Sequence, residues 1–174
     1  MPRIAILGGG LCGRLTALQL AEQGLSVALF DKSGRKGENA AAYVAAAMLA
    51  PAAEAVEATP EVIKLGRQSI PLWRNIRGRL KTPTMMQENG SLIVWHGQDK
   101  PLSGEFVRHL KRGGVADDEI VRWHANDIAE REPQLGGRFS DGLYLPTEGQ
   151  LDGRQMLSAL ADALDGLNVP CHWE

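Results

Sequence analysis

Residues 4–31 read IAILGGGLCGRLTALQLAEQGLSVALFD, and this stretch decides the fold of the first part of the chain. An apolar run, residues 4–7, leads into a glycine-rich turn, and a second apolar run, residues 27–30, ends at Asp31. Glycines 8, 10 and 13 match the dinucleotide fingerprint, where they allow a tight turn, close backbone approach to a pyrophosphate and close helix–strand packing. A carboxylate at about twenty residues' distance can accept hydrogen bonds from ribose hydroxyls. The order of these elements predicts a βαβ unit that binds an adenine dinucleotide.

The helix expected after the glycine turn has a stripe of small residues, because Gly13, Ala17 and Ala21 recur every four positions. Such a stripe lets the helix lie close against a sheet, while the opposite face of the helix meets solvent. Three polar side chains of this helix are therefore expected to face water: Arg14, Gln19 and Glu22.

The composition limits the classes of function. The chain has 174 residues, of which 44% are hydrophobic and 23% charged, and this is typical of a globular protein with a core. Its net charge of −2 gives no electrostatic reason to expect nucleic acid or an anionic membrane as a partner. No run approaches the roughly 18 apolar residues of a membrane span. Two cysteines do not make a disulfide framework, so we expect a reducing, cytoplasmic location. The sequence leaves a homo-oligomer open.

Beyond the fingerprint, turn and capping signals predict further elements. Thr59-Pro60-Glu61 is a helix start, and Asp152 with Gln155 forms a capping pair for a second helix. Two strands, residues 85–88 and 91–96, are expected to form a hairpin across Asn89-Gly90. The remaining predicted elements are a helix over 104–112, strands over 120–123 and 142–145, a short helix near Asp127, and a final strand within 167–173.

Residues 39–58 are rich in alanine and are interrupted by Pro51. Such a segment forms a buried helix, or it threads its backbone closely past a large flat ligand, since small side chains permit close approach. The sequence does not separate these two alternatives.

A parallel sheet built only from residues 4–7, 27–30 and 167–173 would be small and half covered, whereas parallel sheets are normally buried on both faces. The chain is therefore expected to be the N-terminal part of something larger.

In this order the motifs resemble the glycine oxidase and D-amino acid oxidase family of flavoproteins, most closely the glycine oxidases of thiamine biosynthesis. The resemblance covers most of the chain. It rests on the fingerprint with Asp31 and on four further segments: AAAMLAPAAE at 45–54, ENGSL at 88–92, EREP at 130–133, and GLYLP with EGQLDGR between 142 and 154.

The resemblance implies an α/β fold, with a Rossmann-like FAD-binding βαβ domain and an inserted α+β substrate domain, both incomplete here. Residues 1–80 would be the first part of the FAD domain, 81–150 part of the substrate domain, and 151–174 the return to the FAD domain. FAD is the implied cofactor. The implied contacts to it are Gly8, Gly9, Gly10, Leu11, Cys12, Gly13, Asp31, Lys32, Ala45, Ala46, Ala47, Met48 and Leu49.

The implied activity is oxidation of the CH–NH bond of glycine or another small amino acid or amine to an imine, with release of peroxide. The family's second half, which supplies the residues that hold the substrate carboxylate, is absent. No catalytic residue can therefore be named, and the 174-residue chain by itself is expected to be inactive. Two alternatives share the fingerprint: a flavin-dependent hydroxylase or protein-modifying flavoprotein, and a non-catalytic FAD-binding fragment.

Two positions depart from the family pattern. Ala47 stands where the family usually has glycine; if that backbone needs a positive φ, alanine costs stability or shifts the loop. Gly153 replaces a proline that is common after Asp152.

Overall fold

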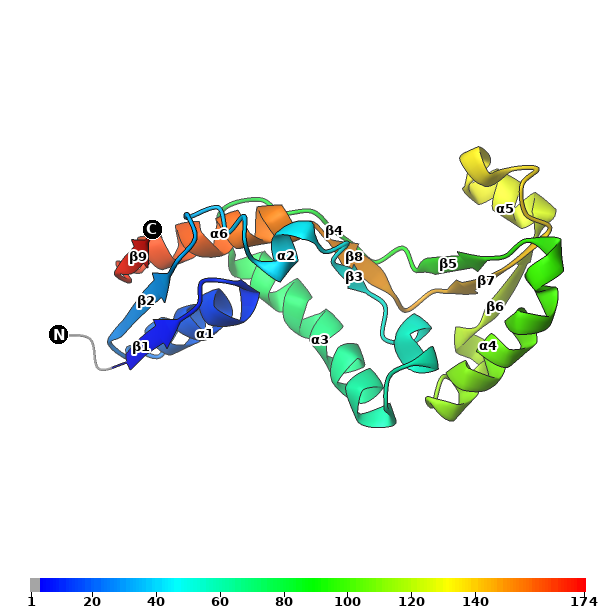
Figure 1. Ribbon diagram of the computed structural model, residues 1–174, viewed down its shortest axis with the longest axis horizontal. Coiled ribbons are helices and arrows are strands. Elements are labelled where there is room, and N and C mark those ends of the chain that lie inside the picture. The colour runs from blue at the N-terminus through cyan, green and yellow to red at the C-terminus, as the bar shows by residue number, and fades with distance from the viewer. Residues whose placement is uncertain (1–3) are drawn as a thin grey trace. The chain divides into compact units, whose positions relative to one another are not determined.

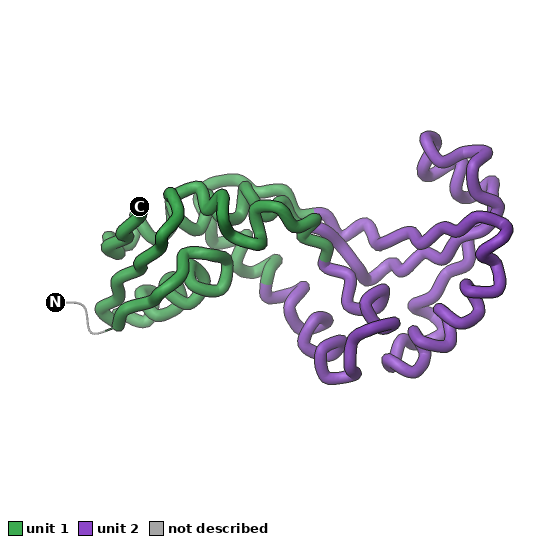
Figure 2. The backbone as a smooth tube through the Cα atoms, viewed as in Figure 1, with its two compact units in different colours: residues 1–48, 73–86, 151–174 green, residues 49–72, 87–150 purple. Residues whose placement is uncertain are grey.

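The computed structural model describes residues 4–174, which divide into two compact units (Figure 2). Residues up to 48, 73–86 and 151–174 form unit 1, and residues 49–72 and 87–150 form unit 2. The domain division predicted at residues 80 and 150 remains a prediction. The α/β class is confirmed.

Unit 1 is built on a three-stranded parallel sheet (Figure 1). Its strands are β1 (Ile4–Leu7), β2 (Val27–Asp31) and β9 (Cys171–Trp173), in the order β1-β2-β9. Ile4 lies opposite Val27, and Asp31 lies opposite Trp173. The predicted return of the chain to the first sheet is therefore confirmed, although its last strand is shorter than expected.

Two helices pack together in this unit, α1 (Leu11–Glu22) and α6 (Gly153–Gly166). Ala17 of the predicted small-residue stripe is fully buried. The start of α6 is capped as predicted, since the Asp152 carboxylate accepts the Gln155 N–H at 2.9 Å. The Gln155 side chain does not complete a reciprocal pair. Its Oε1 instead accepts the Met85 N–H, at 2.8 Å.

The alanine-rich segment does not form a single buried helix. It divides into α2 (Ala41–Val44), the short strand β3 (Met48–Leu49) and a 3₁₀ turn over Ala53–Val56. The helix α3 (Pro60–Arg79) begins where predicted and continues through Pro71. Strand β3 belongs to a second small sheet, with the order β3-β8-β4, where β8 is Gly149–Leu151 and β4 is Met86–Gln87.

Unit 2 contains an antiparallel sheet of β5 (Ser91–Val94), β7 (Asp141–Leu145) and β6 (Val121–His124), with β7 in the centre. The helices α4 (Lys100–Arg112) and α5 (Ala125–Arg131) belong to it, together with 3₁₀ turns over Gly97–Asp99, Asp117–Glu119 and Pro133–Leu135. Its core is a cluster of apolar side chains: Ala52, Ala55, Ile63, Leu110, Val115 and Leu145.

The predicted hairpin across Asn89-Gly90 is wrong. The chain bends at Asn89, and Gly90 has φ +78°, but β4 pairs with β8 while β5 pairs with β7. The Gly90 N–H donates to the carbonyl of Glu148 at 2.9 Å, so later segments of the chain supply the partners that a local hairpin would have supplied. Among the helices of residues 4–174, none combines the length and apolar composition that crossing a membrane requires.

Glu148 is the completely buried carboxylate of unit 2. Its Oε1 accepts the backbone N–H groups of Ala52 and Ala53, at 2.7 and 2.8 Å. Burial raises the pKa of Glu148 above its usual value, while these hydrogen bonds oppose the rise. The carboxylate thus satisfies the amides at the start of the 3₁₀ turn that follows the alanine-rich segment.

We expect Glu148→Ala to destabilise the protein by about 2–4 kcal/mol, because the buried N–H of Ala52 and the partly buried N–H of Ala53 lose their acceptor. Chemical denaturation of the variant and of wild type measures the difference. Glu57→Ala, at an exposed position nearby, is the matched control and should stay within about 0.5 kcal/mol of wild type. Equal stabilities for the two variants would contradict the assignment.

Candidate nucleotide-binding site

The glycine turn between β1 and α1 has a backbone that side chains would disrupt. Gly8 has φ +109°, a conformation that L-residues rarely adopt. A Cβ at Gly13 would overlap the carbonyl oxygen of Gly8, and a Cβ at Gly9 would lie 2.7 Å from Cζ3 of Trp173. Glycine is required at 8 and 13 for the two reasons predicted, the turn and the close packing of α1.

Asp31, at the end of β2, directs its carboxylate toward this turn. Oδ2 accepts the N–H of Gly9, and Oδ1 accepts the N–H of Ser33 at 2.6 Å. Partial burial works against the charged form, yet these N–H groups hold the pKa of Asp31 below its ordinary value. The carboxylate is therefore ionised at neutral pH. Each oxygen can accept more than one hydrogen bond, so capacity remains for ribose hydroxyls.

The first turn of α1 is suited to an anion. Gly10 occupies the N-cap position without a side-chain hydrogen bond, and the first turn contains no acidic residue. A helix N-terminus has backbone N–H groups without intrahelical partners and carries a partial positive charge, so it favours a phosphate group. The turn thus fits the pyrophosphate of a dinucleotide, and Asp31 fits its ribose.

A cavity of about 610 Å³ lies over this turn, a size typical of small-molecule sites. The predicted site residues that line it are Gly8, Gly9, Gly10, Leu11, Cys12, Gly13, Asp31, Lys32 and Ala45. The structure therefore brings together the two segments, the glycine turn and the end of β2, that sequence order had separated. Ala46, Ala47, Met48 and Leu49 are not among the lining residues, and their contact with the flavin remains a prediction.

Sequence reasoning missed several residues of this cavity. They come from the loop after β2 and from α2: Ser33, Gly37, Asn39, Ala40, Ala41 and Ala42. For Ser33 and Gly37 the available signal was the polar stretch 32–38 directly after the acid, which the sequence identified only as a loop. The other four lie in the alanine-rich segment 39–58, for which close passage by a flat ligand was one of the two alternatives.

The prediction for Arg14 is wrong. Gln19 and Glu22 of α1 are exposed as expected, but Arg14 has no exposed surface. Burial lowers the pKa of Arg14 below its ordinary value, and the charge of Asp31 opposes that shift. The helical pattern placed Arg14 on the polar face, whereas the loop after β2 and helix α6 cover it with backbone carbonyls.

Ala47 has φ +53°, which is the left-handed conformation. This is the positive φ that would make alanine unfavourable where the family usually has glycine. Its carbonyl accepts the Leu151 N–H at 3.0 Å. A Cβ at Gly153 would overlap the carbonyl oxygen of Ala42 and lie 3.6 Å from the Ala47 Cβ. The two unusual residues are therefore neighbours, and Gly153 is needed because the backbone of residue 42 approaches it closely.

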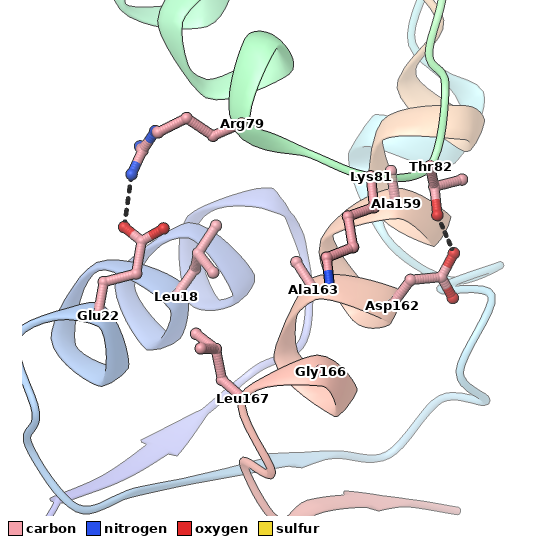
Figure 3. Close-up of a pocket in the computed structure, with 10 residues that line it drawn as sticks. All are labelled: Leu18, Glu22, Arg79, Lys81, Thr82, Ala159, Asp162, Ala163, Gly166 and Leu167. Atoms are coloured by element: carbon pink, nitrogen blue, oxygen red, sulfur yellow. Dashed lines mark hydrogen bonds and ion pairs between the residues drawn. The ribbon is translucent and has the colours of Figure 1, made fainter.

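A second hollow in unit 1, of about 350 Å³, is unrelated to the glycine turn (Figure 3). Apolar side chains of α1 and α6, including Leu18 and Ala159, line it. Two polar contacts lie at its edge, Arg79 to Glu22 and Thr82 to Asp162, each at 2.6 Å (Figure 3). None of its lining residues belongs to the fingerprint, so we assign the nucleotide to the larger cavity.

Comparison with known proteins identifies the family. Residues 3–174 match the family DAO, described as FAD dependent oxidoreductase. The chain belongs to the DAO family. FAD is the cofactor of this family, in agreement with the dinucleotide features of the turn.

Several relatives of this DAO-family chain are named proteins. It is 35% identical over 165 residues to a putative thiamine biosynthesis oxidoreductase, ThiO, of Rhizobium etli, covering 94% of this chain and 46% of that protein. It is 30% identical over 167 residues to a glycine oxidase of Geobacillus kaustophilus, covering 92% of this chain and 42% of the relative. The chain thus spans just under half the length of these relatives.

The crystal structure of a glycine oxidase from Bacillus cereus has the same fold. The TM-score is 0.80 at 20% identity, over 99% of this chain and 46% of that one. The predicted fold class, incomplete relative to the family, is confirmed.

We expect Gly13→Ala to destabilise the DAO-family turn by about 2 kcal/mol or more, because the new methyl group overlaps the Gly8 backbone. Thermal unfolding and the FAD content of the purified protein measure the effect. Gly78→Ala is the control, since its Cβ would meet nothing within 4 Å and alanine favours the helix. A Gly13→Ala protein with wild-type stability and full FAD content would refute the packing argument.

Ala47→Gly should stabilise the protein by up to about 1 kcal/mol, because relief of the left-handed strain exceeds the added flexibility of the unfolded chain. Ala45→Gly is the matched control. Ala45 has φ −70° and ψ 148°, which alanine adopts without strain, so the same exchange should destabilise there. Denaturant midpoints of both variants decide the matter, and a loss of stability in Ala47→Gly would contradict the strain.

Proposed function

We propose that the protein oxidises the CH–NH bond of glycine or of another small amino acid or amine to an imine, with release of peroxide. The observation that carries the proposal is the glycine turn with Asp31 in a DAO-family chain whose relatives are named glycine oxidase and ThiO. The relatives extend well beyond this chain, so the activity is proposed for the full-length protein.

The bound flavin supplies the chemistry of hydride acceptance from carbon. The residues of this chain position that group. The open N-terminus of α1 would hold the pyrophosphate, and the ionised Asp31 would hold the ribose. Both contacts fix the adenosine end of the cofactor, which sets where its reactive ring can lie.

Residues 45–49 are proposed to lie beside the flavin ring. In this chain they do not form a buried helix, and Ala45, Ala46 and Met48 are exposed. The small exposed side chains of Ala45 and Ala46 suit close contact with a flat ring, which was one of the two alternatives for this segment. Substrate-binding residues are assigned to the part of the family that has no counterpart in this sequence.

We also propose a reducing, cytoplasmic location. Cys12 and Cys171 are free thiols, and Cys12 is exposed beside the nucleotide cavity. An oxidising compartment would expose this thiol to modification at the cofactor site.

The test uses the full-length protein purified with its FAD. Under anaerobic conditions, glycine, alanine and N-methylglycine are added in turn, and bleaching of the flavin absorbance is followed. A peroxidase-coupled assay in air then measures peroxide. We expect bleaching by at least one of these amines, and one peroxide for each amine oxidised.

Other outcomes separate the alternatives. A flavin that no amine reduces, but that NADPH reduces, would indicate a hydroxylase. A flavin that neither reduces would indicate a protein that binds FAD without amine oxidation. Either result would refute the proposal.

A further inference from the structure

The peptide groups around Gly9 are held from three sides. Asp31 accepts the N–H of Gly9, and the Nε of Arg14 donates to its carbonyl. The ring of Trp173 lies so close that a Cβ at Gly9 would be 2.7 Å from it. Gly9 is the central residue of the turn that receives the pyrophosphate, so these contacts determine the shape of that turn.

Arg14 connects this turn to segments far away in the sequence. Its Nη1 donates to the carbonyl of Leu157 in α6 at 2.5 Å, and its Nη2 donates to the carbonyl of Arg35 at 2.8 Å. Its guanidinium carbon lies 4.8 Å from the centre of the Trp173 ring, within the range of a cation–π contact. One planar group thus joins the glycine turn, the loop after β2, helix α6 and strand β9.

The hydrogen-bond partners of the buried Arg14 side chain are unusual. Buried charged groups are usually paired, yet the side-chain hydrogen bonds of Arg14 in the described chain go to three backbone carbonyls. The planar guanidinium group has N–H donors that point in different directions. It can therefore bind three carbonyl acceptors at once without a carboxylate partner. The loop after β2 leaves room for the guanidinium because Gly37 has no side chain. A Cβ at Gly37 would lie 3.1 Å from Nη2 of Arg14.

We propose that Arg14 is a positioning residue for the adenosine diphosphate part of FAD. It fixes the Gly9 carbonyl, and with it the direction of the turn's N–H groups, and it fixes the loop that lines the same cavity through Arg35. The inference rests on FAD being the cofactor of the full-length protein, but not on which amine is oxidised.

The test compares FAD binding by three variants of the full-length protein. Arg14→Met removes the donors, Arg14→Lys keeps the charge but loses the fork, and Arg79→Met is the matched control. The Arg79 side chain pairs with Glu22 at the surface of the same unit, and neither residue lines the nucleotide cavity. After removal of the flavin, the dissociation constant for FAD is measured by fluorescence titration, and that for ADP by competition.

We expect Arg14→Met and Arg14→Lys to weaken FAD binding roughly 10- to 100-fold, with an equal factor for ADP. Arg79→Met should change both constants by less than about threefold. An unchanged FAD constant in Arg14→Met, whatever its melting temperature, would show a merely structural role. Wild-type binding by Arg14→Lys would show that charge alone matters, and a loss in Arg79→Met as large as in Arg14→Met would show a general charge effect. Each of these results overturns the proposal.

A second pair of variants covers the case in which Arg14→Met does not fold. Trp173→Leu removes the ring that lies against both Gly9 and Arg14, whereas Trp173→Phe keeps an aromatic face. We expect weaker FAD and ADP binding in Trp173→Leu and partial rescue in Trp173→Phe; equal, wild-type binding by both would overturn the proposal. A wild-type protein that binds no FAD would instead contradict the cofactor assignment itself.

Discussion

Within unit 1, the close approach of the chain to itself at the glycine turn constrains everything near the nucleotide. Gly13 must lack a side chain because the Gly8 carbonyl occupies that space, and Gly9 must lack one because Trp173 does. These contacts let α1 start directly over the sheet, with its unpartnered N–H groups at the edge where Asp31 ends β2. If this approach failed, the anion site and the ribose acceptor would no longer face the same cavity.

The turn is completed by residues that arrive late in the sequence. Strand β9 and helix α6 follow the fingerprint by more than a hundred residues, yet Trp173 and the carbonyl of Leu157 contact Gly9 and Arg14 respectively. Closing such a long loop costs conformational entropy, and packing of α6 against α1 offsets it. Unit 2 also depends on residues that are far apart in the sequence, because Glu148, just before β8, accepts the N–H groups of Ala52 and Ala53.

Prediction succeeded where the signal was local and failed where partners came from elsewhere. The Asp152 cap, the start of α3 at Pro60 and the small-residue face of α1 follow from short-range steric and hydrogen-bonding rules. The hairpin at Asn89-Gly90 failed because β8 and β7 offer pairing that the sequence does not reveal. The prediction that Arg14 faces water failed because a helical pattern shows only which residues are polar. It does not show that a later segment supplies carbonyl groups that bind the buried guanidinium.

The sequence by itself determined the βαβ unit, its glycine turn and the acid that ends β2, because each depends on residue types at fixed short spacing. It also indicated a risk of backbone strain at Ala47, because alanine stands there in place of the family's usual glycine. Only the tertiary structure decided that Ala47 does adopt a positive φ, that it lies beside Gly153, and that Arg14 is buried. Those outcomes depend on contacts between segments remote in the chain, and such contacts leave no periodic mark on the sequence.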